Sequence, residues 1–264
     1  LGLLAFWHRL GQSAGGRRFR VLAATITAAS LAWGVLVGSY FGVAPPPDSL
    51  LGRLNLLDIN DFDTMMRLSI GIGVLHLVLA NGVRALGLWP RFSALVPIGW
   101  ILVAAGGYAA WLVGDAAGST GTTIAFSTLG LGLLLVFFAG SERAVTGAGS
   151  ILMRGVDGLV ALTQITKIFG DALSYLRLFA LGLASASLAL TFNDLAQQVG
   201  AQVEGLGLLL KILLLLIGHV LNLLLGLVSG VVHGLRLNYI EFYNWALSGE
   251  GYPFRPFKKT EIIE

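Results

Sequence analysis

The sequence predicts an all-α, polytopic transmembrane helical bundle of about six spans, the last two long, tilted and antiparallel. Two observations predict this class. Hydrophobic residues make up 56% of the 264 residues and charged residues only 12%, about half the charged share of a soluble domain. Apolar runs of about 20 residues recur along the chain, and in hydrocarbon a helix satisfies its backbone hydrogen bonds internally.

Four shorter spans are expected at about 21–42, 66–88, 92–114 and 122–140, followed by two longer ones at about 158–203 and 207–245. Proline marks two of the joins, at 45–47 and at 90, and proline ends helices. We divide the chain into residues 1–20, the end of a preceding membrane helix and a cytoplasmic loop; 21–140, a four-helix supporting membrane bundle; 141–158, a cytoplasmic loop; 159–247, a two-helix hairpin; and 248–264, a cytoplasmic tail. Because the chain begins in an apolar run without Met, we expect a fragment that lacks its N-terminal part.

Charge in the loops predicts the orientation, since short cytoplasmic loops carry excess Lys and Arg. Arginines precede the first span and recur at 84, 91, 143 and 154, and the tail adds Arg255, Lys258 and Lys259, whereas the intervening loops are mainly acidic. We therefore place both ends of this chain in the cytoplasm. The net charge of +3 is scattered instead of forming a stripe, which argues against nucleic acid as a partner.

Three classes of chemistry find no support in the sequence. The absence of cysteine excludes disulfides and thiol nucleophiles. No glycine-rich phosphate loop and no His, Asp or Glu cluster with metal-ligand spacing occurs. We therefore predict no metal, no cofactor and no catalytic site within this chain.

Polar residues in the final hairpin follow helical spacing. Arg177 and Arg236 lie in apolar sequence, where each arginine costs roughly 2.5–3.5 kcal/mol unless it faces protein or water. At a helical rotation of 100° per residue, each arginine shares one face of its helix with other polar residues, which together form a polar stripe. The first stripe contains Gln164, Lys167, Asp171, Ser174 and Arg177; the second contains His219, Asn222, Gly226, Ser229, His233 and Arg236, flanked by Glu241.

The hairpin geometry is expected to bring the two arginines level. The midpoint between them falls in the turn-forming sequence 204–207, so the two helices should run antiparallel. From the turn to either arginine is about 30 residues, or about 45 Å of helix, whereas half the hydrocarbon core is only about 15 Å. The helices must therefore be tilted or project beyond the membrane.

Three stretches carry a resemblance to a known family: GDALSYLRLFALGLASA at 170–186, HGLRLNYIEFYN at 233–244 and SGEGYPFRPF at 248–257. Together they resemble the C-terminal membrane region of subunit a of the V-type ATPases, called subunit I in bacteria and archaea. The family has eight membrane helices behind a cytoplasmic N-terminal domain, and this chain is similar to the last six.

The resemblance implies a stator membrane subunit of a rotary ATPase, with its spans in a prokaryotic plasma (inner) membrane. Arg177 and Arg236 match the arginines that face a rotating proteolipid (c/K) ring, whose carboxylates carry H+ or Na+. The other expected partners are the lipid bilayer and further ATPase subunits, including peripheral and central stalk proteins. The hairpin would then be the ion path. On the cytoplasmic side, Lys167, Asp171 and Glu241 would line one half-channel; Ser185, Asp194, His219 and Asn222 would line the other, and Ser174, Ser229 and His233 are further candidates. Relatives often carry acidic or His groups where this chain has Ser185 and Gly226, which leaves the outer half-channel and the ion open.

Other interpretations stay open at this point. The arginines would instead form structural ion pairs, Lys167 and Asp171 would pair with each other, and His219 and His233 would be packing or positioning residues. At the level of function, one alternative is a multipass secondary transporter that binds an anionic substrate. The other is a membrane assembly scaffold that transports nothing.

Overall fold

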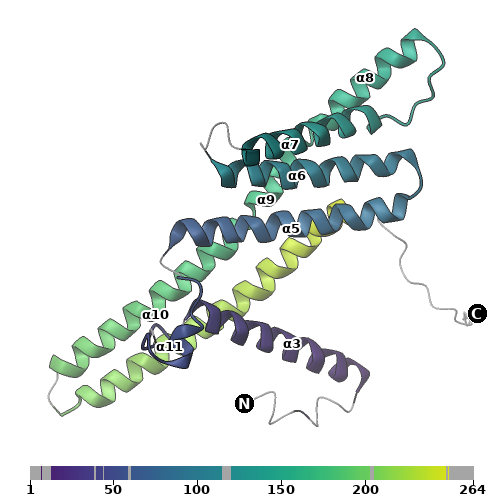
Figure 1. Ribbon diagram of the computed structural model, residues 1–264. Coiled ribbons are helices and arrows are strands. Elements are labelled where there is room, and N and C mark those ends of the chain that lie inside the picture. Colours follow the sequence, from purple (N-terminus) through teal and green to yellow (C-terminus); the bar gives the residue numbers. More distant parts are fainter. Residues whose placement is uncertain are drawn as a thin grey trace, which may run out of the picture. The chain divides into compact units, whose positions relative to one another are not determined.

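The computed structural model describes residues 7, 13–38, 40–43, 45–58, 61–114, 120–202, 205–247 and 249. Six helical stretches in these ranges are long and apolar enough to cross a membrane: Ala14–Val37, Phe62–Leu88, Phe92–Val113, Thr120–Ala139, Ala148–Gln202 and Gly207–Ala246. The described part of the chain has no strand beyond the isolated bridge between Tyr40 and Val43. The predicted all-α fold with six candidate spans is confirmed (Figure 1). The expected chain ends, 1–6 and 250–264, lie outside the described residues.

The chain divides into two compact units, described separately here. The first unit combines Leu1–Ile72 with Leu173–Leu235, and the second combines Gly73–Ala172 with Arg236–Glu264. The expected four-helix bundle at 21–140 therefore contributes residues to both units.

In the first unit, α3 (Ala14–Val37) leads into a tight turn beside the hairpin helices. The Ser13 hydroxyl accepts the Gly16 amide and caps the helix start, and Gly38 ends it in the left-handed conformation at φ 65°. The short helix α4 (Leu50–Arg53) follows, and then the first turns of α5 (Phe62–Leu88).

The hairpin consists of α10 (Leu176–Gln202) and α11 (Gly207–Arg236), which pack antiparallel in the first unit. Gly207 approaches the Gly200 carbonyl, Gly218 packs against the Phe192 ring, and Asn222 forms a hydrogen bond with Ser185. The residue numbers of the contacts therefore decrease along α11 as they increase along α10, which is the antiparallel arrangement. Small residues let the helix backbones approach closely, as is usual between membrane helices. The predicted antiparallel hairpin is therefore present, and its tilt stays a prediction.

The second unit contains a layer of close-packed helices that includes α6 (Leu95–Val113), α7 (Thr120–Ala139) and α8 (Ala148–Leu162). A Cβ added at Gly106 would lie 2.6 Å from the Leu129 amide nitrogen, and one at Gly99 would lie 2.8 Å from the Gly132 carbonyl. Gly158 of α8 packs on the Phe137 carbonyl in the same way. Glycine is therefore required at these crossings.

Two local predictions differ from the structure. The first expected long helix, 158–203, is three helices, α8, α9 (Ile165–Leu173) and α10, separated by turns at 163–164 and 174–175. Helix α8 also begins at Ala148, inside the expected loop 141–158. Glycines in 141–158 suggested a loop, but each glycine within a helix costs only about 1 kcal/mol relative to Ala, and apolar residues at 151, 152, 156 and 159 continue a helical period.

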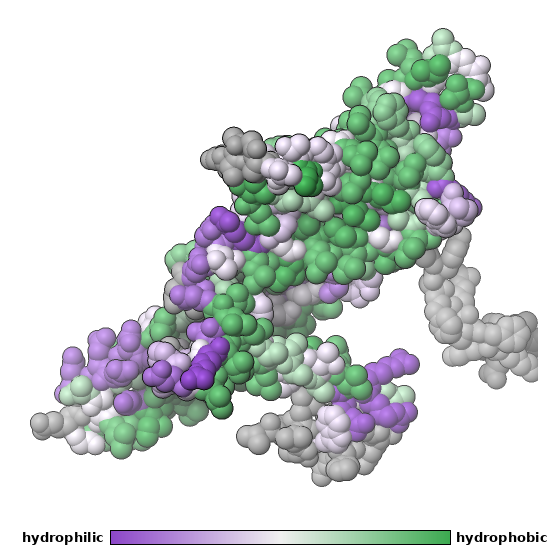
Figure 2. All heavy atoms as spheres, in the orientation of Figure 1, coloured by the Kyte–Doolittle hydropathy of each residue, from purple (hydrophilic) through white to green (hydrophobic). Residues whose placement is uncertain are grey.

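The membrane-length helices leave much apolar surface uncovered. Only 6% of the most apolar window in Gly207–Ala246 is buried, and 11% of that in Ala148–Gln202, against 33% in Phe62–Leu88. Figure 2 shows the apolar side chains that result, in green, over the helices. This surface is suited to lipid or to a partner protein.

Candidate functional site

Arg177 lies in the first turn of α10, directly after the break at Ser174 and Tyr175. Its Nη2 donates to the Ser174 hydroxyl at 3.3 Å, and its Nη1 is buried without a hydrogen-bond partner in the described ranges. The two ion pairs that the described residues form are Arg67–Asp63 and Arg143–Asp157. The structural ion pair considered for Arg177 is therefore not found among the described residues. The positive end of the α10 dipole lies at the same place and disfavours a cation there.

Arg236 is the last residue of α11 and is exposed. A π-helical segment, Leu237–Phe242, follows immediately, and α12 (Tyr243–Ala246) completes the helix. Such π-helical insertions occur frequently at functional sites. Arg177 and Arg236 belong to different compact units, and their level placement stays a prediction.

Ser185 and Asn222 form a reciprocal pair across the hairpin. The Ser185 hydroxyl donates to Asn222 Oδ1 at 2.8 Å, and Asn222 Nδ2 donates to the Ser185 carbonyl at 3.0 Å. Both side chains are half-buried. The structure thus joins two of the predicted channel residues, about 12 Å along α10 from Arg177 at 1.5 Å per residue.

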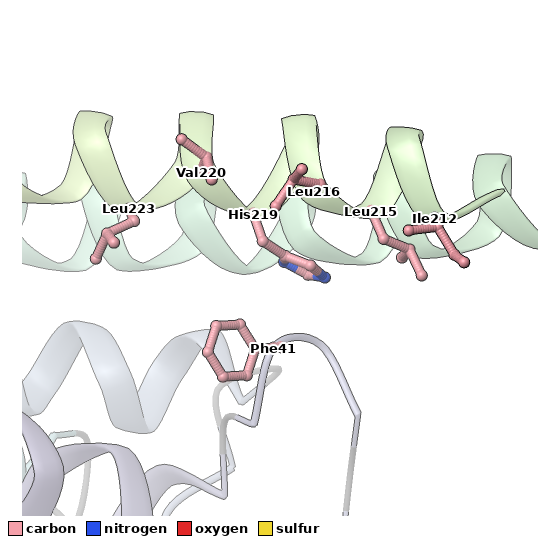
Figure 3. A pocket seen from close by; sticks show the side chains of 7 residues that line it. All are labelled: Phe41, Ile212, Leu215, Leu216, His219, Val220 and Leu223. Carbon is pink, nitrogen blue, oxygen red and sulfur yellow. The ribbon is translucent and has the colours of Figure 1, made fainter. Parts of the chain in front are cut away.

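His219 contacts a residue that sequence reasoning missed. Its Nε2 lies 3.1 Å from Asn193 Oδ1 of α10, and Asn193 Nδ2 donates to the Phe41 carbonyl at 2.8 Å. The Phe41 ring meets the imidazole edge to face, with ring centroids 5.3 Å apart (Figure 3). Asp194, which we expected to line this path, is exposed. From the sequence we chose Asp194 because it is charged, whereas in the structure the side chain of its neighbour Asn193 faces α11.

The remaining candidates on α11 make fewer contacts. Ser229 and His233 are half-buried, and His233 Nδ1 is buried with no hydrogen-bond partner in the part of the chain that the structure describes. His233 and Arg177 lie about the same number of residues from the turn, so extending the antiparallel register of the hairpin places them level with each other.

In the second unit, Lys167 and Asp171 both contact Trp245, which sequence reasoning also missed. Trp245 Nε1 donates to Asp171 Oδ2 at 2.6 Å, and Lys167 Nζ lies 4.8 Å from the centre of the indole ring. Within the described residues, Lys167 and Asp171 form no ion pair within 4.0 Å, so the expected direct pair is replaced by contacts that both make with Trp245.

Glu241 is 2% exposed and lies within electrostatic range of Asp171 and of His76. His76 of α5 stacks on Phe242, with ring centroids 4.6 Å apart at 22°. This stack makes His76 part of the packing of the second unit. Two carboxyl groups, a lysine and an imidazole are thus brought together in the second unit.

The arrangement offers polar and titratable groups along both hairpin helices, but no metal site. The described ranges contain no group of three or more His, Asp or Glu side chains that would hold a metal ion. The chemistry available is hydrogen bonding, proton exchange and electrostatic attraction of an anion.

Comparison with known proteins gives a consistent result. The model of the V-type ATPase 116kDa subunit family matches residues 168–259. The chain is similar to the V-type ATP synthase subunit I of Chlamydia pneumoniae, at 36% identity over 215 residues, which covers 76% of this chain and 28% of that protein.

Two further relatives match along most of this chain. The V-type ATP synthase subunit I of Borreliella burgdorferi is 30% identical over 92% of this chain and 42% of its own length. The A-type ATP synthase subunit I of Methanocaldococcus jannaschii is 25% identical over 97% of this chain and 40% of its own length. The chain thus spans less than half the length of these relatives. No solved structure matches it.

Proposed function

The chain belongs to the V-type ATPase 116 kDa subunit family, and from this premise we propose that it forms half-channels for ion movement to and from a rotating proteolipid ring. Ion flow would be coupled to ATP hydrolysis or synthesis in separate subunits. Further partners would be the peripheral and central stalk proteins. Both ends of this chain would face the cytoplasm, with the spans in a plasma membrane.

One observation carries this proposal: Arg177 is a half-buried cation in an apolar helix, with no carboxylate partner among the described residues. Keeping such a cation at membrane depth costs roughly 2.5–3.5 kcal/mol. The hairpin around it is barely buried. A partner that supplies both an apolar surface and an anion would offset both costs, and a ring of proteolipids with buried carboxylates has these properties.

Electrostatics gives the direction of the effect on the ring. A cation within about 4–6 Å favours the ionised form of a carboxylate by about 1.4–4 kcal/mol. A ring site that reaches Arg177 and Arg236 would therefore release its ion. Because arginine stays protonated at any working pH, it does not relay the proton and so keeps the two half-channels separate.

The two polar groups of the structure supply the half-channels in this proposal. Lys167, Asp171 and Glu241 would line the cytoplasmic one. The pair Ser185–Asn222 and the imidazole of His219 would line the outer one. Ser174 would orient Arg177 through the 3.3 Å hydrogen bond, and His233 and Ser229 would extend the polar face of α11 toward it.

The test is ATP-driven ion pumping by the full complex in vesicles. Arg177→Ala should abolish pumping, and Arg177→Lys should reduce it strongly, because lysine loses its proton more readily than arginine. Arg67→Ala serves as the matched control, since Arg67 is an exposed arginine paired with Asp63 on α5. Undiminished pumping by Arg177→Ala would overturn the proposal.

The same preparation separates the alternatives. A scaffold predicts that Arg177→Lys leaves ion flux unchanged. A secondary transporter predicts uptake of an anion by vesicles that contain this subunit alone, without the ring.

A further inference from the structure

The hydrogen bonds around Asn193 fix the roles of the two His219 nitrogens. The Phe41 carbonyl only accepts, so the Asn193 atom that faces it at 2.8 Å must be the donor Nδ2. Asn193 Oδ1 then faces His219 Nε2 at 3.1 Å and accepts from it. In the neutral imidazole, one nitrogen donates and the other accepts. Nε2 therefore carries the hydrogen, and Nδ1 carries the lone pair.

His219 Nδ1 is buried and has no hydrogen-bond partner in the described ranges. Leaving a buried polar atom unsatisfied costs about 1–3 kcal/mol, and such atoms often have a functional role. The surrounding side chains offer nothing polar, because the groove beside the imidazole, of about 400 Å³, is lined by Phe41, Ile212, Leu215, Leu216, Val220 and Leu223 (Figure 3). The Nδ1 lone pair can therefore accept a hydrogen bond or a proton only from a molecule that enters this groove.

Phe41 lies in the tight turn after α3, where the Val43 amide donates to the Tyr40 carbonyl at 2.9 Å. Phe41 has a φ of 52°, which makes it the non-glycine residue with positive φ among the described residues. Bulky residues rarely adopt this conformation, and such strain is kept where the surroundings impose it, commonly at functional positions. Gly42 beside Phe41 also has a positive φ, of 77°, so the tight turn itself accounts for this conformation. The carbonyl bond to Asn193 and the ring contact with the imidazole then hold this turn against the hairpin.

We propose that His219 is the proton-accepting residue of the outer half-channel, acting through Nδ1, with Asn193 and Phe41 as its positioning residues. Asn193 orients the imidazole, and the Phe41 ring restricts access to it. This inference rests on the proposed function, and it names H+ as the transported ion. A free imidazole lone pair can take up a proton, whereas hard cations such as Na+ take oxygen ligands.

The proposed proton transfer through His219 needs no reactant other than water. A proton from outer water bonds to the Nδ1 lone pair and gives an imidazolium, while Nε2–H stays on Asn193 Oδ1. The imidazolium then releases the Nδ1 proton to water beside the Ser185–Asn222 pair, one helical turn further along α11. The neutral imidazole returns to its starting tautomer, and one proton has moved inward toward the ring carboxylate.

Two measurements on the full complex in vesicles test the proposal. The first is the rate at which diethyl pyrocarbonate modifies His219, followed by mass spectrometry, because this reagent reacts with an accessible imidazole lone pair. Phe41→Gly should raise that rate about tenfold, since glycine keeps the positive φ and removes only the ring. Val43→Gly is the matched control from the same turn, where the side chain is 63% exposed, and should leave the rate unchanged.

The second measurement is ATP-driven H+ pumping by His219→Gln. Glutamine keeps a hydrogen-bonding side chain opposite Asn193 but takes up no proton, so pumping should fall about tenfold in fully assembled complexes. An unchanged modification rate in Phe41→Gly, undiminished pumping in His219→Gln, or pumping of Na+ in place of H+ would each overturn the inference. The proposed function can fail separately from this inference. In that case Arg177→Ala would continue to pump, while Phe41→Gly would still raise the rate at which His219 is modified.

Discussion

Trp245→Phe should weaken the second unit by removing one hydrogen bond while keeping an aromatic ring in place. Trp245 is 2% exposed and packs edge to face on Trp100, with ring centroids 5.8 Å apart. Its Nε1 donates to Asp171 Oδ2 at 2.6 Å. Phenylalanine has no donor, so the Asp171 carboxyl group loses this partner, whereas the ring below Lys167 remains.

The size of the effect follows from the charge on the acceptor. A hydrogen bond to a charged group contributes about 1.5–3 kcal/mol to stability. The smaller ring also leaves a void, which adds a packing cost that is unrelated to Asp171. A double-mutant cycle with Asp171→Ala, which has no acceptor, cancels that packing cost, so we expect a coupling free energy of about 1.5–3 kcal/mol between the two positions.

The assay is reversible unfolding of the full-length subunit in mixed micelles, with the free energy of unfolding measured for both single variants and the double variant. Trp33→Phe, at a tryptophan of α3 that is 45% exposed, is the matched control and should change stability little. A coupling below about 0.5 kcal/mol, the level at which independent sites add, would refute the role of this bond in holding α12 to α9.

Two further outcomes are expected. Gly106→Ala should destabilise the subunit by about 1–3 kcal/mol, because its Cβ would lie 2.6 Å from the Leu129 amide nitrogen, whereas Gly107→Ala meets no atom within 4 Å and should be neutral or stabilising in the same unfolding measurement. At the start of α5, hydrogen bonds from the Thr64 hydroxyl and amide lower the pKa of Asp61 below its ordinary value of 3.8. The stabilisation is therefore present above pH 3.8 and lost as the pH falls through the lower folded-state pKa. The protection of the Thr64 amide against hydrogen exchange, relative to an unprotected amide at the same pH, should therefore fall in acid, and Asp61→Asn should remove this pH dependence.

The fold class and the positions of the spans were readable from composition and run length. This is so because the bilayer leaves few options: a segment of about 20 apolar residues must satisfy its own backbone hydrogen bonds, and a helix does so. The antiparallel hairpin was readable for a similar reason, since a glycine-containing turn lies midway between two long apolar segments.

Local interruptions were not readable in this way. The break at 174–175, directly before Arg177, and the π-helical segment that begins directly after Arg236 occur in sequence that continues a helical apolar period. Such a period reports the mean direction of the side chains, and one or two residues with altered backbone hydrogen bonds leave it almost unchanged.

The sequence by itself determined which residues are polar within the membrane segments, among them Arg177, His219 and Asn222. That the first stripe shares one helix face stays a prediction, and the turns at 163–164 and 174–175 divide it among separate helices. Only the tertiary structure decided the partners of these polar residues. The sequence did not single out Asn193 or Trp245. In the structure, Asn193 orients His219, and Trp245 contacts both Lys167 and Asp171. The physical reason is that helical periodicity depends on neighbours three or four residues apart, whereas a hydrogen bond between helices depends on how the backbones approach, which close contacts such as Gly218 against Phe192 set.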